Sequence, residues 1–305
     1  MLDMVNGEGK KKRETLVQKE EKEKKAEEDL ERKLMVRELE RSEINLPELK
    51  AILRGRSSGP SKKGTFRHYY APNHSKIGVF SDAHIGQEMF DAILFERMGK
   101  TFKKENVDAV YQAGDILEGM SGRDGQIYEL TQVGFSKQIK YAAQLFNSFL
   151  NGLKVFGIDG NHDAWYKKKN NAGVIVGEEL SKLVTNYTHL GEMEADVKLA
   201  PNIVMKLFHP NDGTAYATSY KLQKIIESFS GGEKPQILLE GHYHKSLYMF
   251  HRNIHALECG TISGQTVWMR GKKIPAHKGF WILDIWYNKN GIQKFVPEFF
   301  PEYID

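Results

Sequence analysis

The sequence is nearly without cysteine. Cys259 is the one cysteine among 305 residues, so the chain cannot form an internal disulfide. A chain without such a cross-link is typical of a reducing compartment, and we expect a cytoplasmic protein. No stretch approaches the roughly 20 apolar residues of a membrane-spanning helix. The N-terminus soon becomes densely charged and lacks the apolar core of a signal peptide, so we expect neither export nor membrane insertion.

Neither positive nor negative charge predominates in the chain. The chain has 44 Lys and Arg against 40 Asp and Glu, which gives a formal net charge of +4. This mild excess permits nucleic acid as a partner but does not require it. The hydrophobic share of 40% is ordinary for a globular protein, and the length suits one large domain or two modest ones.

Residues 10–42 differ in composition from the rest of the chain. They contain twelve Lys or Arg and ten Asp or Glu among 33 positions, with no Gly or Pro. Opposite charges recur at helical spacing, as in Glu20 with Lys24, which favours a solvated helix. Residues 55–64 (GRSSGPSKKG) indicate a flexible linker. We predict a charged helical extension with its linker over residues 1–64, which either binds a protein partner, self-associates or has no specific partner, and a globular domain over residues 65–305.

Beyond Tyr70, short apolar runs alternate with longer amphipathic ones. The apolar runs predict buried strands at residues 77–80, 109–111, 155–158, 203–208 and 237–239. The amphipathic runs predict helices at residues 88–102, 128–150, 172–183 and 215–229. After His244 the pattern predicts further strands at residues 247–250, 254–257, 266–269 and 280–285. This alternation is typical of a layered α/β fold.

Each of the first five predicted strands is followed by polar side chains that can bind a metal. These side chains are Asp82, His84, Asp115, Asn161, His209, His242 and His244. Loops that leave the carboxyl ends of strands in an α/β sheet converge on one crevice. Residues two apart at a strand end point the same way, so the Asp-x-His and His-x-His pairs can each present two ligands together. The sequence therefore predicts one cluster of seven ligands.

The predicted ligands are imidazole nitrogens and carboxylate or amide oxygens, without thiolate. This donor set points to Mn²⁺, Fe²⁺, Zn²⁺, Co²⁺ or Ni²⁺ rather than to Ca²⁺ or a Cys-type structural zinc. Seven ligands, one of them bridging, are too many for one ion and suit two. Two cations about 3.5–4 Å apart can clamp a phosphate and activate a water or hydroxide.

The series Asp-x-His, Gly-Asp, Gly-Asn-His-Asp, His and Gly-His-x-His, in this order between Asp82 and His244, resembles the calcineurin-like metallophosphoesterase superfamily. Within it, the pattern is most similar to the SbcCD-type DNA repair exonucleases. The resemblance implies a four-layer α/β/β/α sandwich and two divalent metal ions, with Mn²⁺ the expected metal. It also implies hydrolysis of phosphoester bonds by a metal-bound hydroxide, without a covalent enzyme intermediate.

The resemblance further implies a role for each residue of the series. The ligands divide between two cations: Asp82, His84 and His244 on the first, Asn161, His209 and His242 on the second, and Asp115 bridging both. His162 is implied as a catalytic residue that stabilises developing charge or protonates the leaving oxygen. Asp163 is implied as the residue that orients the His162 ring.

Two departures from known branches of the superfamily narrow the expected activity. Phosphoprotein phosphatases continue Gly-Asp with Asp-Arg-Gly, whereas here Asp115 is followed by Ile116-Leu117-Glu118-Gly119. This difference counts against a Ser/Thr phosphatase. The tyrosine ligand of the purple acid phosphatases is not evident either.

The expected substrate depends on a loop that follows the catalytic motif directly. It mixes aromatic and basic side chains, namely Trp165, Tyr166, Lys167, Lys168 and Lys169. Such a loop either stacks a base and neutralises backbone phosphates or is a solvated basic loop. Our leading hypothesis is a nuclease that cleaves DNA, as an exonuclease or endonuclease. The alternatives are a small-substrate phosphatase or cyclic-nucleotide phosphodiesterase, and a scaffold subunit with an auxiliary phosphoesterase domain.

Overall fold

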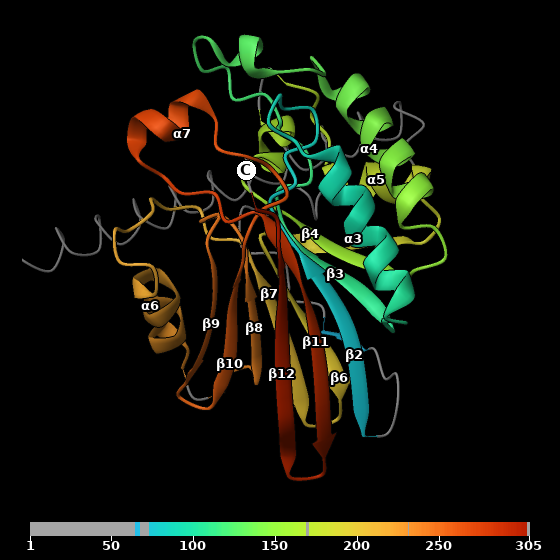
Figure 1. Cartoon of the computed structure of the whole chain (residues 1–305), viewed down its shortest axis with the longest axis vertical. Coiled ribbons are helices and arrows are strands. Elements are labelled where there is room, and N and C mark those ends of the chain that lie inside the picture. The colour runs from blue at the N-terminus through green and yellow to red at the C-terminus, as the bar shows by residue number, and fades with distance from the viewer. Residues whose placement is uncertain (1–64, 68–72, 169–170, 231, 304–305) are drawn as a thin grey trace, which may run out of the picture. The chain divides into compact units, whose positions relative to one another are not determined.

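The computed structural model describes residues 65–67, 73–168, 171–230 and 232–303, all within one compact unit, residues 61–305. Two six-stranded sheets pack face to face, and helices cover their outer faces (Figure 1). The predicted charged helix and its linker lie outside the described residues. The division of the chain between residues 64 and 65 therefore stays a prediction.

The first sheet, named here the β2 sheet, has the strand order β12-β11-β2-β3-β4-β5. Strands β2 to β5 run parallel, and β11 joins β2 in antiparallel orientation. The bounds are β2 (His74–Phe80), β3 (Ala109–Ala113), β4 (Val155–Asp159), β5 (Tyr187–Glu192), β11 (Gly279–Asn288) and β12 (Gly291–Pro301).

The second sheet, named here the β8 sheet, has the order β1-β6-β7-β8-β10-β9. Strands β7, β8 and β10 run parallel at its centre, while β6 and β9 are antiparallel to their inner neighbours. The bounds are β1 (Thr65–Arg67), β6 (Glu194–Ala200), β7 (Ile203–Phe208), β8 (Ile237–Glu240), β9 (Ser246–His251) and β10 (Ile254–Cys259).

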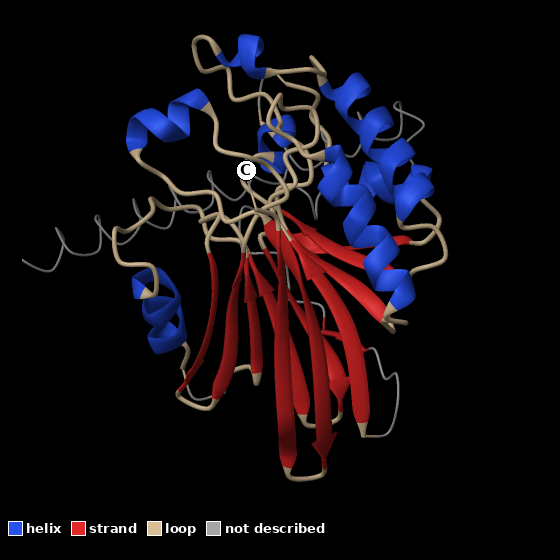
Figure 2. Cartoon of the chain, viewed as in Figure 1, coloured by secondary structure: helices blue, strands red, loops and turns tan. Residues whose placement is uncertain are grey.

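Helices form the two outer layers (Figure 2). The β2 sheet is covered by α3 (Ala92–Lys104), α4 (Phe135–Phe149) and α5 (Val176–Leu183), and the β8 sheet by α6 (Tyr220–Ser228). The loops hold α7 (Val267–Lys272) and two 3-10 turns, η1 (Gln126–Glu129) and η2 (Asp163–Lys167). None of the described helices is long and apolar enough to span a membrane.

Alternation along the strands builds three hydrophobic cores between the four layers. On β8, Ile237 and Leu239 enter the core between the sheets, whereas Leu238 enters the core under α6. On β3, Tyr111 faces the other sheet and Val110 faces the helices. Successive strand residues point to opposite faces, so one strand feeds two cores. The predicted α/β/β/α sandwich is confirmed.

The five strands predicted to precede the ligand motifs are present, but other features differ from the predictions. The helices expected from residues 88, 172 and 215 begin four or five residues later, at Ala92, Val176 and Tyr220. The helix expected over residues 128–150 begins only at Phe135, after the turn η1. Residues 266–269, expected as a strand, begin helix α7, because the Thr266 side chain caps that helix by accepting a hydrogen bond from the Met269 N–H at 3.1 Å. Strands β1, β5, β6 and β12 were not predicted.

The parallel strands end at one edge of the two sheets, and their loops gather there (Figure 1). Backbone hydrogen bonds join the loops after β2 and β3: Asp82 N donates to Gly114 O at 3.0 Å, and His84 N donates to Asp115 O at 3.1 Å. The loops that carry the predicted ligands are therefore held against one another by the main chain.

The close approach of α3 to the end of α4 generates a test of the packing. A methyl group at Gly99 would lie 2.5 Å from the Phe149 carbonyl oxygen. We expect Gly99→Ala to lower the free energy of unfolding by about 1–3 kcal/mol, although alanine favours helices, because the backbone leaves no room. Urea unfolding followed by circular dichroism measures this. The matched control is Gly271→Ala in α7, where the added methyl group would contact no neighbouring atom within 4 Å. A comparable loss of stability in this control would contradict the account.

Candidate functional site

The seven predicted ligands come together at the carboxyl ends of the strands. Asp82 and His84 follow β2, Asp115 follows β3, and Asn161 follows β4. His209 follows β7, and His242 and His244 follow β8, so both sheets contribute. The side chains of Asp82, His84, Asp115 and His209 are almost completely buried. The site is therefore at the bottom of a cleft between the loops.

One group of donors contains Asp82, His84 and His244. The two imidazole Nε2 atoms face each other at 3.0 Å, and Asp82 Oδ1 lies 3.3 Å from His244 Nε2 and 3.8 Å from His84 Nε2. All three residues offer a donor atom within 4.8 Å of the others. Two imidazole nitrogens and a carboxylate oxygen converging in this way suit a divalent transition-metal ion.

The second group contains Asp115, Asn161, His209 and His242. His209 Nε2 lies 3.0 Å from Asn161 Oδ1 and 3.2 Å from Asp115 Oδ2, and donor atoms of Asp115, His209 and His242 fall within 4.8 Å of one another. Asp115 Oδ2 is also 3.9 Å from His84 Nε2 in the first group. Asp115 thus lies between the groups, where a bridging carboxylate is expected.

Hydrogen bonds to the far ring nitrogens orient three of the imidazoles. His84 Nδ1 contacts Glu118 Oε2 at 3.0 Å, His209 Nδ1 contacts the Ala113 carbonyl oxygen at 2.8 Å, and His242 Nε2 contacts the Asp212 carbonyl oxygen at 2.6 Å. When these nitrogens donate, the opposite nitrogens keep lone pairs for a metal. Burial, and next the charge on His209, lower the pKa of His242 to about 4, which favours the neutral form that binds metals.

Glu118 contacts the site, although the sequence analysis assigned it no role. Its carboxylate is buried, accepts hydrogen bonds from Gln87 at 2.9 Å and Gln126 at 3.1 Å, and also contacts His84. Glu118, His84 and His162 form a further group of side chains that could bind a metal, but the Glu118 carboxylate already contacts the Nδ1 atom of His84. We interpret Glu118 as a positioning residue. The signal in the sequence was an acid in the same short loop as Asp115.

The backbone of the site is held in a conformation that non-glycine residues seldom adopt. Five of the predicted ligands have positive φ angles, between 49° and 84°: Asp82, His84, Asp115, His242 and His244. Such residues usually occupy this region only where the surrounding structure holds them, and they cluster at functional sites. Gly160 permits a close approach, since a methyl group there would lie 2.2 Å from Asp115 Oδ1.

His162 lines the cleft, but Asp163 does not orient its ring. His162 Nδ1 lies 2.8 Å from the Glu118 carbonyl oxygen, so that carbonyl holds the imidazole. The Asp163 carboxylate instead accepts backbone N–H groups from Gly160, Ile116 and Leu117 at 2.9–3.0 Å. The predicted orientation by Asp163 is therefore wrong. This carboxylate ties the loop after β4 to the loop after β3, a backbone role that sequence spacing does not reveal.

The loop of residues 165–169 is only partly available to a substrate. Trp165 lines the cleft with its ring 4.0 Å from that of His162. Tyr166 is fully buried, and Lys167 pairs with Glu192 at 2.7 Å, so the structure contradicts a substrate contact for Tyr166 and leaves Lys167 neutralised. Lys168 is exposed, and Lys169 lies outside the described residues.

A cleft of about 640 Å³ opens above the ligands. Its walls come from segments that the sequence did not connect with the site. They are the segment 121–129, the loop 212–214 and the α7 region, which contribute Ser121, Arg123, Gln126, Glu129, Asp212, Gly213, Thr214, Thr266, Trp268, Met269, Lys272 and Ile274. The side chains below this cleft fit two divalent ions, because their imidazole nitrogens and oxygens form two groups with Asp115 between them.

Comparisons with known proteins agree with this geometry. The family model of the calcineurin-like phosphoesterases matches residues 75–246. The DNA polymerase II small subunit of Methanothermobacter thermautotrophicus is 22% identical over 235 residues, 62% of this chain and 48% of the relative, so this chain spans about half the relative's length.

Two solved structures are also similar, with low identity. A phosphodiesterase described as archaeal has a TM-score of 0.43 at 15% identity, covering 74% of this chain and 99% of that one. The phosphoesterase YfcE of E. coli has a TM-score of 0.40 at 16% identity, covering 72% and 98%.

The hydrogen bond from His84 to Glu118 generates a test of the positioning role. We expect Glu118→Gln to weaken divalent-metal binding about 10- to 100-fold, because the amide cannot supply the charge that orients the ligand and raises its basicity. Titration calorimetry with Mn²⁺ measures the change. The control is Glu129→Gln, an acid of the same cleft that pairs with Arg123 rather than with a ligand. Wild-type affinity in Glu118→Gln would rule out the role.

Protonation of the ligands generates a second test. Burial opposes a charge on His209, but the carboxylate of Asp115 outweighs it and raises the pKa of the imidazole to about 9. Below that pH the proton must leave before His209 can bind a metal. We expect Mn²⁺ affinity to rise as the pH is raised from 6 towards 9, with protons released on binding. Calorimetry in buffers of different ionisation enthalpy detects the release, and an affinity that is flat across this range would contradict the account.

Proposed function

Because the chain belongs to the calcineurin-like phosphoesterase family and is a metal-dependent phosphoesterase, we propose that it hydrolyses phosphodiester bonds in DNA. The observation that carries the proposal is the meeting of seven donor side chains, from five loops of two sheets, below a cleft much larger than a phosphate group. Asp82, His84 and His244 would hold one cation, and Asn161, His209 and His242 a second, with Asp115 between them. Bound there, the cations neutralise phosphate charge and lower the pKa of a water molecule.

His162 is the residue of this chain that is best placed to move a proton. Its Nδ1 is occupied by the Glu118 carbonyl, which leaves Nε2 to exchange a proton with a substrate oxygen. Burial disfavours the charged ring, but the carboxylates of Asp115 and Glu118 outweigh burial and raise the pKa of His162. A protonated imidazole at the rim can therefore donate to the leaving oxygen. Trp165 packs against the ring and limits its rotation.

The choice of DNA as substrate has three supports. The cleft is lined by two indoles, those of Trp165 and Trp268, which suit stacking on bases, and by Lys272, which pairs with no carboxylate that the structure describes and suits a backbone phosphate. The chain is mildly basic, with a pI of about 8.8. The relative from Methanothermobacter is named as a subunit of a DNA polymerase. We also propose that the metal is manganese and that the protein acts in DNA repair.

A small nucleotide is the second candidate substrate, because a cleft of about 640 Å³ also accommodates a single nucleotide. A panel assay with Mn²⁺ separates the candidates: single-stranded DNA, duplex DNA, RNA, cyclic nucleotides and bis-p-nitrophenyl phosphate. The proposal expects DNA cleavage that weakens steeply as salt rises. Cleavage of the small esters with DNA untouched at low salt would sink it.

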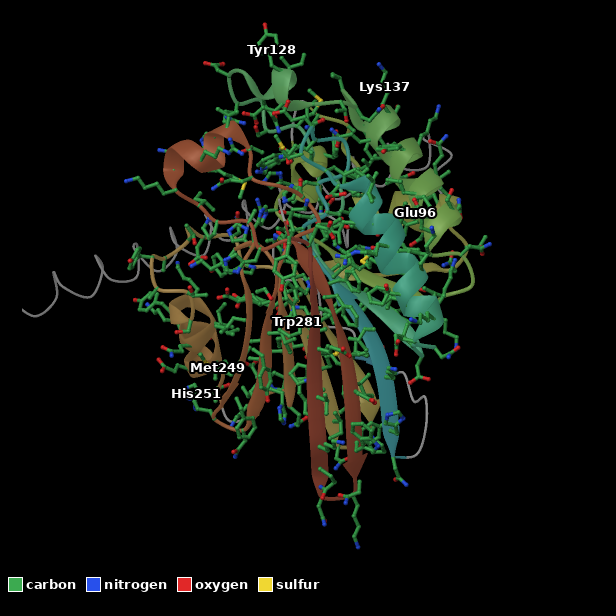
Figure 3. The ribbon with its side chains drawn as sticks, in the orientation of Figure 1. Glu96, Tyr128, Lys137, Met249, His251 and Trp281 are labelled. Carbon is green, nitrogen blue, oxygen red and sulfur yellow. The ribbon has the colours of Figure 1, made fainter. Side chains whose placement is uncertain are left out.

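His162 provides the mutational test. We expect His162→Ala to retain its metal content and to lose turnover by ~10²–10⁴, because the ring acts on the proton and not on the metal. Metal analysis and steady-state assays on the same sample measure the two effects. The control is His251→Ala, at the end of β9 away from the loops (Figure 3). Unimpaired turnover in His162→Ala would remove the residue from the mechanism.

A further inference from the structure

We propose that Trp268 of α7, together with Arg123 and Lys272, is a platform on which an unpaired base of single-stranded DNA stacks in the same cleft as the metal ligands. The proposal deepens the proposed function and rests on it, since it names the form of DNA that enters the cleft. We call this surface the α7 platform, formed by Arg123, Trp268 and Lys272, which all line the cleft.

Local structure keeps Trp268 out of the hydrophobic core. Thr266 caps the start of α7, Met269 points inward and is buried, and Gln265 Nε2 donates to the Ile274 carbonyl at 2.6 Å, which closes the segment. The two residues between the cap and Met269 therefore face out, and Val267 and Trp268 are 71% and 46% exposed. The segment therefore presents an indole that is free to contact another molecule.

Trp268 lines the same cleft as His162 and the predicted ligands. The guanidinium carbon of Arg123 lies 5.8 Å from the centre of its ring, and Arg123 is itself held by Glu129 at 2.5 Å. Arg123, from the segment 121–129, and Trp268, from helix α7, thus form one surface in the cleft. A base stacked on the indole would lie in the same cleft as the predicted ligands.

The charge of the segment points to a polyanion. Residues 265–278 contain four Lys or Arg and no Asp or Glu. Lys278 pairs with Asp91, whereas Arg270, Lys272 and Lys273 make no ion pair with any residue that the structure describes. Cations beside an exposed aromatic ring are the arrangement by which proteins hold single strands, with stacking on the bases and attraction to the phosphates.

The burial of the ligands favours a single strand over a duplex. Asp82 and Asp115 are at most 1% exposed, so a scissile phosphate must descend into the cleft to reach them. A base inside a duplex already stacks on both faces and cannot also stack on Trp268. Only an unpaired base satisfies both conditions, and such bases occur in single strands and at frayed ends.

The test measures binding by the full chain without metal, so that its readout is independent of turnover. Fluorescence anisotropy in EDTA follows a labelled oligodeoxynucleotide of roughly ten nucleotides. We expect Trp268→Ala to raise Kd on the order of 10- to 100-fold, the range for loss of one base stack. Trp268→Phe should restore most of the affinity. The matched control is Trp286→Ala, which removes an indole that also carries a cation, Lys294 at 4.3 Å, on β11 opposite the start of β2.

Three outcomes would overturn the platform. They are unchanged DNA affinity in Trp268→Ala, an equal loss in Trp286→Ala, and tighter binding of blunt duplex or of RNA than of single-stranded DNA. If the chain cleaves no phosphodiester in the presence of Mn²⁺, the proposed function is wrong, whatever the binding result. A chain that cleaves DNA equally well with and without Trp268 sinks only the platform. The two failures are therefore distinguishable.

Discussion

The constraint on which the structure depends is that imidazole and carboxylate side chains, each able to bind a metal, lie close together in a buried site. Two imidazole nitrogens 3.0 Å apart, with carboxylates on both sides, have no favourable arrangement unless protons or cations lie between them. Divalent ions satisfy all of these donors together. The parallel strands of two sheets, ending at one edge, are what deliver donors from five loops to this point.

Holding those donors requires more than the strands. Five of the predicted ligands have left-handed backbone. The loops are linked by hydrogen bonds from the backbone N–H groups of Asp82 and His84 and by the carboxylate of Asp163. Strained residues persist only where neighbours hold them, so these links form part of the site although they touch no metal. Glu118 has a similar role for a side chain, since its carboxylate contacts the Nδ1 atom of His84 and orients that imidazole.

The sequence predicted what depends on local pattern and missed what depends on packing. Buried strands and the polar residues after them are visible as apolar runs that end in Asp, Asn or His, and this pattern located the seven predicted ligands that the structure brings together. The capping by Thr266, the burial of Tyr166 and the backbone contacts of Asp163 depend on neighbours distant in the chain, and no spacing rule reveals them. The cytoplasmic location and the helix of residues 10–42 stay predictions, because nothing described here bears on them.

The most direct measurement is the stoichiometry of divalent-metal binding to the purified, folded chain, compared with that of Asp115→Asn. Asp115 lies within reach of His209 on one side and His84 on the other. The account predicts two Mn²⁺ ions per wild-type chain and a weakened affinity for both in the variant, because one carboxylate serves both positions. A folded wild-type chain that takes up no divalent ion, or a variant that loses neither, would contradict it.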